Sequence, residues 1–167
     1  MNSVEGLVKE YGGIRLDIGC GENKQPGWVG MDWQELPGVD IIHDVEDYPW
    51  PLPDESVLVA FASHLVEHIN PARGGFLKFM NEVWRVLKPG GEFAIATPHG
   101  YSPGYLQDPT HCNPCNEHTW YYFDPEAGEG LLYSFYKPKP WQLKHIAFDP
   151  TANIEVVMIK RSLNGTK

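Results

Sequence analysis

Residues 14–24 read Ile-Arg-Leu-Asp-Ile-Gly-Cys-Gly-Glu-Asn-Lys, and this stretch decides the fold. Its first five residues alternate in a way that predicts a short strand, and Gly19 and Gly21 allow a sharp backbone turn directly after it. A second apolar run, residues 28–31, is followed by Asp32. An acid at the end of a neighbouring parallel strand can accept hydrogen bonds from the ribose hydroxyls of a bound nucleoside. The order of strand, glycine turn, strand and acid therefore predicts a nucleoside-binding half-site.

Two classes of cofactor use such a half-site, and one residue separates them here. A dinucleotide fold has the pattern Gly-x-Gly-x-x-Gly, but Lys24 stands at the position of the third glycine. The sequence therefore disfavours a bound pyrophosphate. Residues 16–21, Leu-Asp-Ile-Gly-Cys-Gly, instead resemble the first motif of class I S-adenosylmethionine-dependent methyltransferases, in which the glycine turn receives the methionine part of the cofactor and the acid after the second strand holds the ribose.

The resemblance continues through residues 57–69 and the Leu-Lys-Pro-Gly-Gly stretch at 87–91, so it spans residues 14–98. It implies that the turn holds the methionine end, that the end of the second strand holds the ribose, that the end of the third strand borders adenine, and that His64 borders the sulfonium. The cofactor-binding residues expected on this basis are Asp17, Gly19, Cys20, Gly21, Asp32, Trp33, Asp44, Val45 and His64.

The expected fold is α/β and Rossmann-like, with a mostly parallel sheet and an antiparallel C-terminal hairpin. Strands are expected at residues 14–18, 28–31, 39–44, 57–64, 92–98, 141–148 and 154–160. Helices are expected at residues 3–11, from Pro71 to Leu87, and over a shorter stretch within 117–127. The connections in the first half are shorter than the dozen residues a parallel crossover normally needs, so its crossover helices are reduced. One sheet face is then thinly covered, and we expect it to allow a homodimer.

Length and composition limit the remaining possibilities. A chain of 167 residues is expected to form one S-adenosylmethionine-binding domain, residues 1–167. The formal net charge of −9 disfavours a nucleic-acid partner and leaves a small-molecule acceptor as the expected partner. No apolar run suggests a membrane span and the start does not resemble a signal peptide, so we expect a cytoplasmic protein with its three cysteines as free thiols.

Residues 99–130 are rich in Gly, Pro, His, Cys and aromatic residues, and we expect a substrate-side insertion there. Because imidazole titrates nearest neutral pH, the catalytic candidates are His111, then His99, with His64 at the end of the fourth strand. Residues 108–111, Asp-Pro-Thr-His, match a similar stretch after the fifth strand of related small methyltransferases. We expect no metal, although four residues of this segment offer a compressed set of zinc ligands: His111, Cys112, Cys115 and His118.

The expected function is S-adenosylmethionine-dependent methyl transfer to a small-molecule or otherwise undetermined acceptor, with S-adenosylhomocysteine as the product. A sulfonium methyl is already activated, so its transfer needs mainly alignment and the exclusion of water, with a base only where the acceptor loses a proton. The alternatives are a non-catalytic module that binds S-adenosylmethionine or S-adenosylhomocysteine, and a zinc-stabilised interaction domain.

Overall fold

The computed structural model describes residues 4–127 and 135–162, which build one seven-stranded sheet of order β3-β2-β1-β4-β5-β7-β6. The strands are β1 (Ile14–Ile18), β2 (Val29–Asp32), β3 (Ile41–Ile42), β4 (Val57–Ser63), β5 (Leu87–Pro98), β6 (Trp141–Phe148) and β7 (Asn153–Lys160). The helices are α1 (Val4–Tyr11), η1 (Val66–His68), η2 (Ala72–Gly74), α2 (Gly75–Val86), α3 (Pro103–Leu106) and α4 (Glu117–Tyr121).

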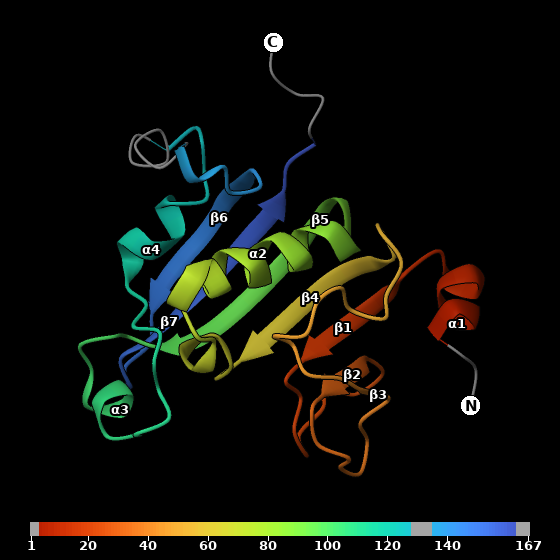
Figure 1. Ribbon diagram of the computed structural model, residues 1–167, viewed down its shortest axis with the longest axis horizontal. Coiled ribbons are helices and arrows are strands. Elements are labelled where there is room, and N and C mark those ends of the chain that lie inside the picture. Colours follow the sequence, from red (N-terminus) through yellow and green to blue (C-terminus); the bar gives the residue numbers. More distant parts are fainter. Residues whose placement is uncertain (1–3, 128–134, 163–167) are drawn as a thin grey trace.

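The sheet has the mixed character that the sequence predicts. β1 to β5 run parallel, whereas β7 pairs antiparallel with β5 and β6 antiparallel with β7. Figure 1 shows the C-terminal hairpin on the opposite side of β5 from β1 and β2. The predicted Rossmann-like sheet with an antiparallel hairpin is confirmed.

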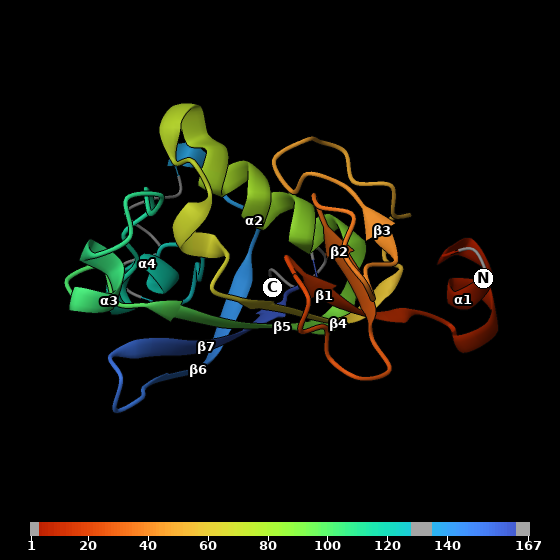
Figure 2. The ribbon, with the colours of Figure 1, turned by 90° about the horizontal axis from the view of Figure 1, so that it is seen from below.

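Helices cover the two sheet faces unequally. Figure 2 shows α2 and α4 on the same side of the sheet, and no helix of the described residues crosses the middle of the opposite side. The connections 19–28 and 33–40, which join β1 to β2 and β2 to β3, contain no helix. The predicted reduction of the crossover helices is therefore confirmed. Self-association through the open face stays a prediction.

Several element boundaries differ from the sequence expectation. β3 has two residues, whereas a strand over residues 39–44 was expected. α2 begins at Gly75 and not at Pro71, because Arg73 and Gly74 both have positive φ angles and interrupt the helix. β5 begins at Leu87, which pairs with Val57 before a register shift, so it is longer than the expected 92–98.

The core lies between the sheet and α2, whose apolar stripe is buried as its spacing predicts. The loop 44–56 is fixed to α2 by a buried carboxylate: Glu82 accepts hydrogen bonds from the backbone N–H of Trp50 at 2.6 Å and from Arg85 Nη2 at 2.6 Å. Arg85 in turn donates to the carbonyl oxygen of Leu52. Among the described residues, no helix has the length and apolar character needed to cross a membrane.

We predict that Glu82→Ala lowers the free energy of unfolding by about 1–3 kcal/mol, because it leaves the buried N–H of Trp50 without an acceptor. Glu92→Ala is the matched control, since it removes a carboxylate that pairs with Lys144 at the surface, and it should cost less than about 1 kcal/mol. Urea denaturation measures both. Equal losses in the two variants would contradict the role given to Glu82.

Candidate functional site

A pocket of about 430 Å³ lies where β1 and β4 end, which is the edge at which open α/β sheets bind their ligands. Its volume is within the range of small-molecule sites. The lining residues are Asp17, Gly19, Cys20, Gly21, Asn23, Gln25, Phe61, Ser63 and His64. Five of the residues expected to bind cofactor, namely Asp17, Gly19, Cys20, Gly21 and His64, thus line one cavity, while Asp32, Trp33, Asp44 and Val45 are not among its lining residues.

The glycine turn has the geometry that its sequence predicts. Gly19 and Gly21 have φ angles of +66° and +51°, in the left-handed region that favours glycine. A Cβ atom at Gly19 would lie 2.8 Å from the side chain of Leu65, so a larger residue would also displace the segment after β4. The backbone N–H groups of Gly19 and Cys20 both donate to the carbonyl oxygen of Met31, which ties the turn to β2.

Asp32 is buried and already has two hydrogen-bond donors in this structure. Its Oδ2 accepts from the N–H of Gly21 at 2.9 Å, and its Oδ1 accepts from the N–H of Gln34 at 2.9 Å. A carboxylate oxygen has more than one lone pair, so these bonds leave capacity for a ribose hydroxyl. Asp32 therefore holds the glycine turn against the end of β2, a role that the sequence did not indicate.

Asp17 is the acid that lines the pocket. Its side chain is 3% exposed and its Oδ2 accepts one hydrogen bond, from the N–H of Gln25 at 2.8 Å. Burial raises the pKa of this carboxyl above its ordinary value of 3.8, against the opposing effects of the Gln25 hydrogen bond and of Lys24. An ionised Asp17 is therefore poorly compensated without ligand and suits a cationic group of a ligand.

Cys20 is no candidate for a nucleophile. Burial, together with the negative charges of Asp17 and Asp32, raises its pKa to about 11. Its thiol is therefore protonated at neutral pH, whereas the thiolate is the reactive form of cysteine.

The other expected adenine-side and ribose-side residues have different surroundings. The Asp44 carboxylate is exposed and accepts a hydrogen bond from the N–H of Glu46 at 2.9 Å, while Val45 packs into the core. Trp33 follows Asp32 and is 68% exposed, which leaves its ring available to a ligand at the end of β2. Their assignment to the cofactor stays a prediction.

His64 has a strained backbone at the mouth of the pocket. Its φ angle is +52°, which is uncommon for a residue with a side chain, and its N–H donates to the carbonyl oxygen of Ala96 at 2.8 Å. The side chain is 56% exposed, and its Nδ1 lies 3.3 Å from Oε1 of the fully buried Glu67. Such strain persists where the surrounding structure imposes it, often at functional sites.

The loop after β5 packs onto the segment that follows β4. The N–H groups of Cys112 and Asn113 both donate to the carbonyl oxygen of Glu67, and Asn113 Nδ2 donates to that of Val66. The ring of His111 lies 4.7 Å from that of His68, measured between centroids. Two of the catalytic candidates, His64 and His111, therefore both lie near Glu67.

His99 has a different position. Its ring contacts Tyr101 and Phe148, its Nε2 lies 3.3 Å from a carboxylate oxygen of Glu117, and its Nδ1 accepts from the N–H of Tyr101. These contacts give His99 a place between the loop and the C-terminal hairpin. It is not among the residues that line the pocket at the glycine turn.

The compressed zinc set is not assembled in the described residues. Cys115 is completely buried in the core, and this burial raises its pKa to about 12. Cys112 is directed elsewhere, since its Sγ donates to the carbonyl oxygen of His68 at 3.3 Å. Within residues 4–127 and 135–162, neither thiol joins a group of three potential metal ligands.

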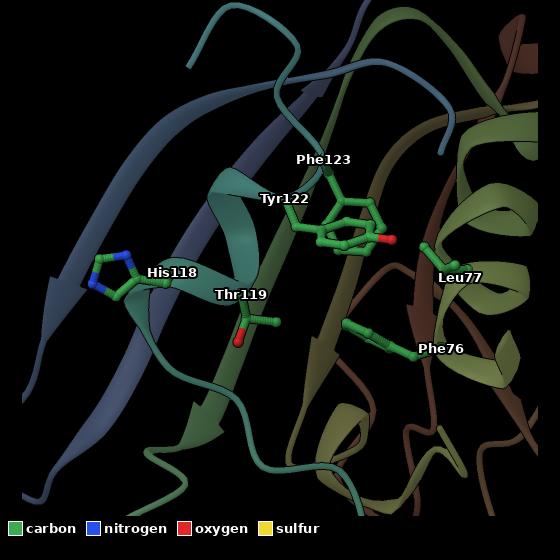
Figure 3. A pocket seen from close by; sticks show the side chains of 6 residues that line it. All are labelled: Phe76, Leu77, His118, Thr119, Tyr122 and Phe123. Atoms are coloured by element: carbon green, nitrogen blue, oxygen red, sulfur yellow. The ribbon is translucent and has the colours of Figure 1, made fainter. Parts of the chain in front are cut away.

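A second hollow, of about 320 Å³, lies between α2 and α4 and is mainly aromatic (Figure 3). Phe76 and Leu77 approach it from α2, and Tyr122 and Phe123 from the end of α4. It shares no lining residue with the pocket at the glycine turn. The expected insertion 99–130 thus contributes both to this hollow and to the loop after β5 that packs against η1. Its residues 128–130 lie outside the described part of the chain.

Part of this chain is similar in sequence to known methyltransferases. A family described as a methyltransferase domain matches residues 33–95. A curated relative from Mycolicibacterium smegmatis, described as a probable S-adenosylmethionine-dependent methyltransferase, is 33% identical over 109 residues, which cover 53% of this chain and 40% of the relative. The chain thus spans less than half the length of this relative.

Solved structures share the fold at low sequence identity. One is an S-adenosylmethionine-dependent methyltransferase from Archaeoglobus fulgidus, with a TM-score of 0.61 and 17% identity over 94% of this chain and 93% of that one. Another, named as the cyclase SpnF, has a TM-score of 0.58 and 15% identity over 89% and 75%. The domain match and the curated relative agree with the resemblance to class I S-adenosylmethionine-dependent methyltransferases, and these solved structures show that the fold is shared.

We predict that Asp17→Asn weakens S-adenosylmethionine binding roughly tenfold to a hundredfold, because it removes a charge-assisted contact worth about 1.5–3 kcal/mol. The unliganded protein should be as stable as wild type or more stable. Since the folded state raises the pKa of Asp17, ionisation above pH 3.8 costs folding free energy. The advantage of asparagine should therefore grow as pH rises above this value and vanish below it, as thermal unfolding at several pH values measures.

Asp32→Ala is the contrasting variant, since it removes the acceptor of two backbone N–H groups. It should lower the free energy of unfolding by about 1–3 kcal/mol and also weaken cofactor binding.

An Asp17→Asn protein that binds the cofactor normally would remove Asp17 from the site.

Proposed function

We propose that this chain transfers the methyl group of S-adenosylmethionine to a small-molecule acceptor at the pocket of β1 and β4. The observation that carries the proposal is the convergence of the buried Asp17, the Gly19–Gly21 turn and the strained His64 on one cavity of about 430 Å³. The class match supports the cofactor, and the acidic character of the chain supports an acceptor other than nucleic acid.

In this proposal each part of the pocket has one role. Asp17 accepts from the α-ammonium group of the cofactor, because a buried carboxylate with one donor suits a cation. The glycine turn lets the methionine part approach the backbone. His64 lies at the other end of the pocket, next to the methyl group that is transferred.

The reaction is a displacement at carbon. A lone pair of the acceptor forms the new bond to the methyl carbon while the carbon–sulfur bond breaks, and its electron pair stays on sulfur to give S-adenosylhomocysteine. The acceptor's proton goes to His64, whose exposed imidazole is held beside Glu67. Positioning supplies most of the acceleration, because the sulfonium is already activated.

The fold by itself allows a second function. The solved structure of SpnF, which is named as a cyclase, has a similar fold, so the fold alone does not require methyl transfer. A non-catalytic module that binds S-adenosylmethionine or S-adenosylhomocysteine is therefore the alternative. Binding of both compounds with no S-adenosylhomocysteine produced from any hydroxyl, amine or carbon acceptor would favour this module.

We predict that His64→Asn lowers the rate of methyl transfer roughly 10²–10⁴-fold, the usual contribution of a general base. Asparagine tolerates a positive φ angle, so the fold and the affinity for S-adenosylmethionine should stay close to wild type. The measurement is S-adenosylhomocysteine formation from methyl-labelled cofactor with a panel of small acceptors, beside calorimetric binding.

His145→Asn, an exposed substitution on β6, is the matched control and should leave both quantities unchanged. Transfer at the wild-type rate in His64→Asn would exclude His64 as the proton acceptor.

A further inference from the structure

Three side chains with metal-ligating atoms meet beside the cofactor pocket. Glu67 and His68 come from η1, and His111 comes from the loop after β5. One potential ligand atom of each lies within 4.8 Å of the others, and this is the one such group of three that the described residues form. The residues are adjacent in the fold although 43 or more positions separate His111 from the other two in the sequence.

The imidazole of His111 is oriented as in a metal ligand. Its Nδ1 lies 2.8 Å from the carbonyl oxygen of Tyr105, which can only accept, so Nδ1 carries the proton. In the neutral ring the lone pair is therefore on Nε2, which lies 3.7 Å from Oδ2 of Asp108. Metal-binding histidines are typically held in this way, with the second nitrogen donating to an oxygen.

His68 is oriented by a longer relay. Its Nδ1 lies 3.1 Å from Thr110 Oγ1, and that hydroxyl donates to Asp108 Oδ1 at 2.6 Å. Because the hydrogen of the hydroxyl is directed at the carboxylate, its oxygen accepts a hydrogen bond from Nδ1 of His68. The Nε2 of His68 thus also carries a lone pair.

Glu67 has a buried carboxyl group, one oxygen of which has no hydrogen-bond donor. The residue is 0% exposed, and its Oε2 accepts from Thr97 Oγ1 at 2.9 Å. Its Oε1 is buried and makes no hydrogen bond, although His64 Nδ1 lies 3.3 Å away. A buried carboxylate oxygen without a partner is costly, and such atoms often mark the site of an ion or a water molecule.

We propose that Glu67, His68 and His111 bind a divalent transition-metal cation, with Zn²⁺ as the reference ion. Two neutral imidazoles and one carboxylate form a ligand set that suits Zn²⁺ and neighbouring first-row metals, whereas Mg²⁺ and Ca²⁺ prefer oxygen ligands alone. One carboxylate offsets half of the ion's charge, and three protein ligands leave a coordination position open.

The location of this site indicates which ligand would occupy the open coordination position of the metal. His64 lines the cofactor pocket and lies beside Glu67, so the cation is next to the sulfonium end of that pocket. A bound cation would polarise an acceptor hydroxyl toward its deprotonated form, which is the nucleophile for the methyl carbon, and the proton would go to His64. We infer an acceptor with a hydroxyl oxygen, an inference that rests on the proposed function.

The first test is calorimetry with Zn²⁺ alone, on protein that has been treated with a chelator and returned to metal-free buffer. One equivalent should bind to the wild type, and His68→Ala and His111→Ala should each bind at least about tenfold more weakly. Glu67→Gln keeps the side-chain shape and should show the same loss. Thermal unfolding in the absence of metal verifies that each variant is folded.

Thr110→Val provides a sharper test because it touches no ligand atom. It removes the oxygen that orients His68 and should weaken Zn²⁺ binding roughly 10–100-fold. The chain offers a matched control in Thr151, since Asp149-Pro150-Thr151 repeats the Asp-Pro-Thr turn, with Asp149 Oδ1 accepting from both the N–H and the hydroxyl of Thr151. Thr151→Val should not change the affinity.

Co²⁺ as a probe separates this site from a cysteine site, because thiolate ligands give a charge-transfer band that a histidine and carboxylate set lacks. Absence of the band, and unchanged Zn²⁺ affinity in Cys112→Ser, are the expected results. No binding of Zn²⁺ to the wild type, or equal binding in His68→Ala and His111→Ala, would overturn the proposal. Bound metal whose removal leaves the transfer rate unchanged would keep the site and overturn its role in activating the acceptor. Bound metal without any transfer would count against the proposed function alone.

Discussion

Side-chain carboxylates hold together the half of the sheet that has no crossover helices, and the candidate site depends on them. Asp32 accepts from the N–H of Gly21, Asp17 from that of Gln25, and Asp40 from that of Gly30, at 2.8–2.9 Å. Parallel strands usually obtain this support from a helix packed across them. Here a hydrogen bond from a backbone N–H to an aspartate side chain holds each short connection instead, and these bonds fix the glycine turn relative to the strand ends. One acid of this set, Asp17, also lines the pocket at the ends of β1 and β4.

The second half of the site depends on a packing contact between two segments far apart in sequence. The backbone of Glu67 accepts from two N–H groups of the loop after β5, so the loop and η1 form one unit at the carboxyl end of β4. This contact places His111 beside His68 and leaves an oxygen of Glu67 buried without a hydrogen bond. The two halves meet at His64, which lines the cofactor pocket and approaches Glu67. Cofactor and proposed metal would therefore act on the same acceptor atom.

Local sequence patterns predicted the sheet well and the site only in part. Alternation and glycine placement are properties of neighbouring residues, so β1, β4 and the turn at Gly19 follow from the sequence directly. α3 was missed although Ser102 caps it and a proline follows, a pattern that could have identified it. The group formed by Glu67 and His111 could not have been found in this way, because it depends on how the loop after β5 packs and no local pattern encodes that packing.

The structure of the chain with S-adenosylhomocysteine bound would test the account most directly. The account predicts the amino group of the ligand beside Asp17, its methionine part along the turn at Gly19 and its sulfur next to His64. A ligand in the aromatic hollow between α2 and α4 would contradict it. So would a dinucleotide in place of S-adenosylhomocysteine at the glycine turn, since Lys24 stands where its third glycine should be.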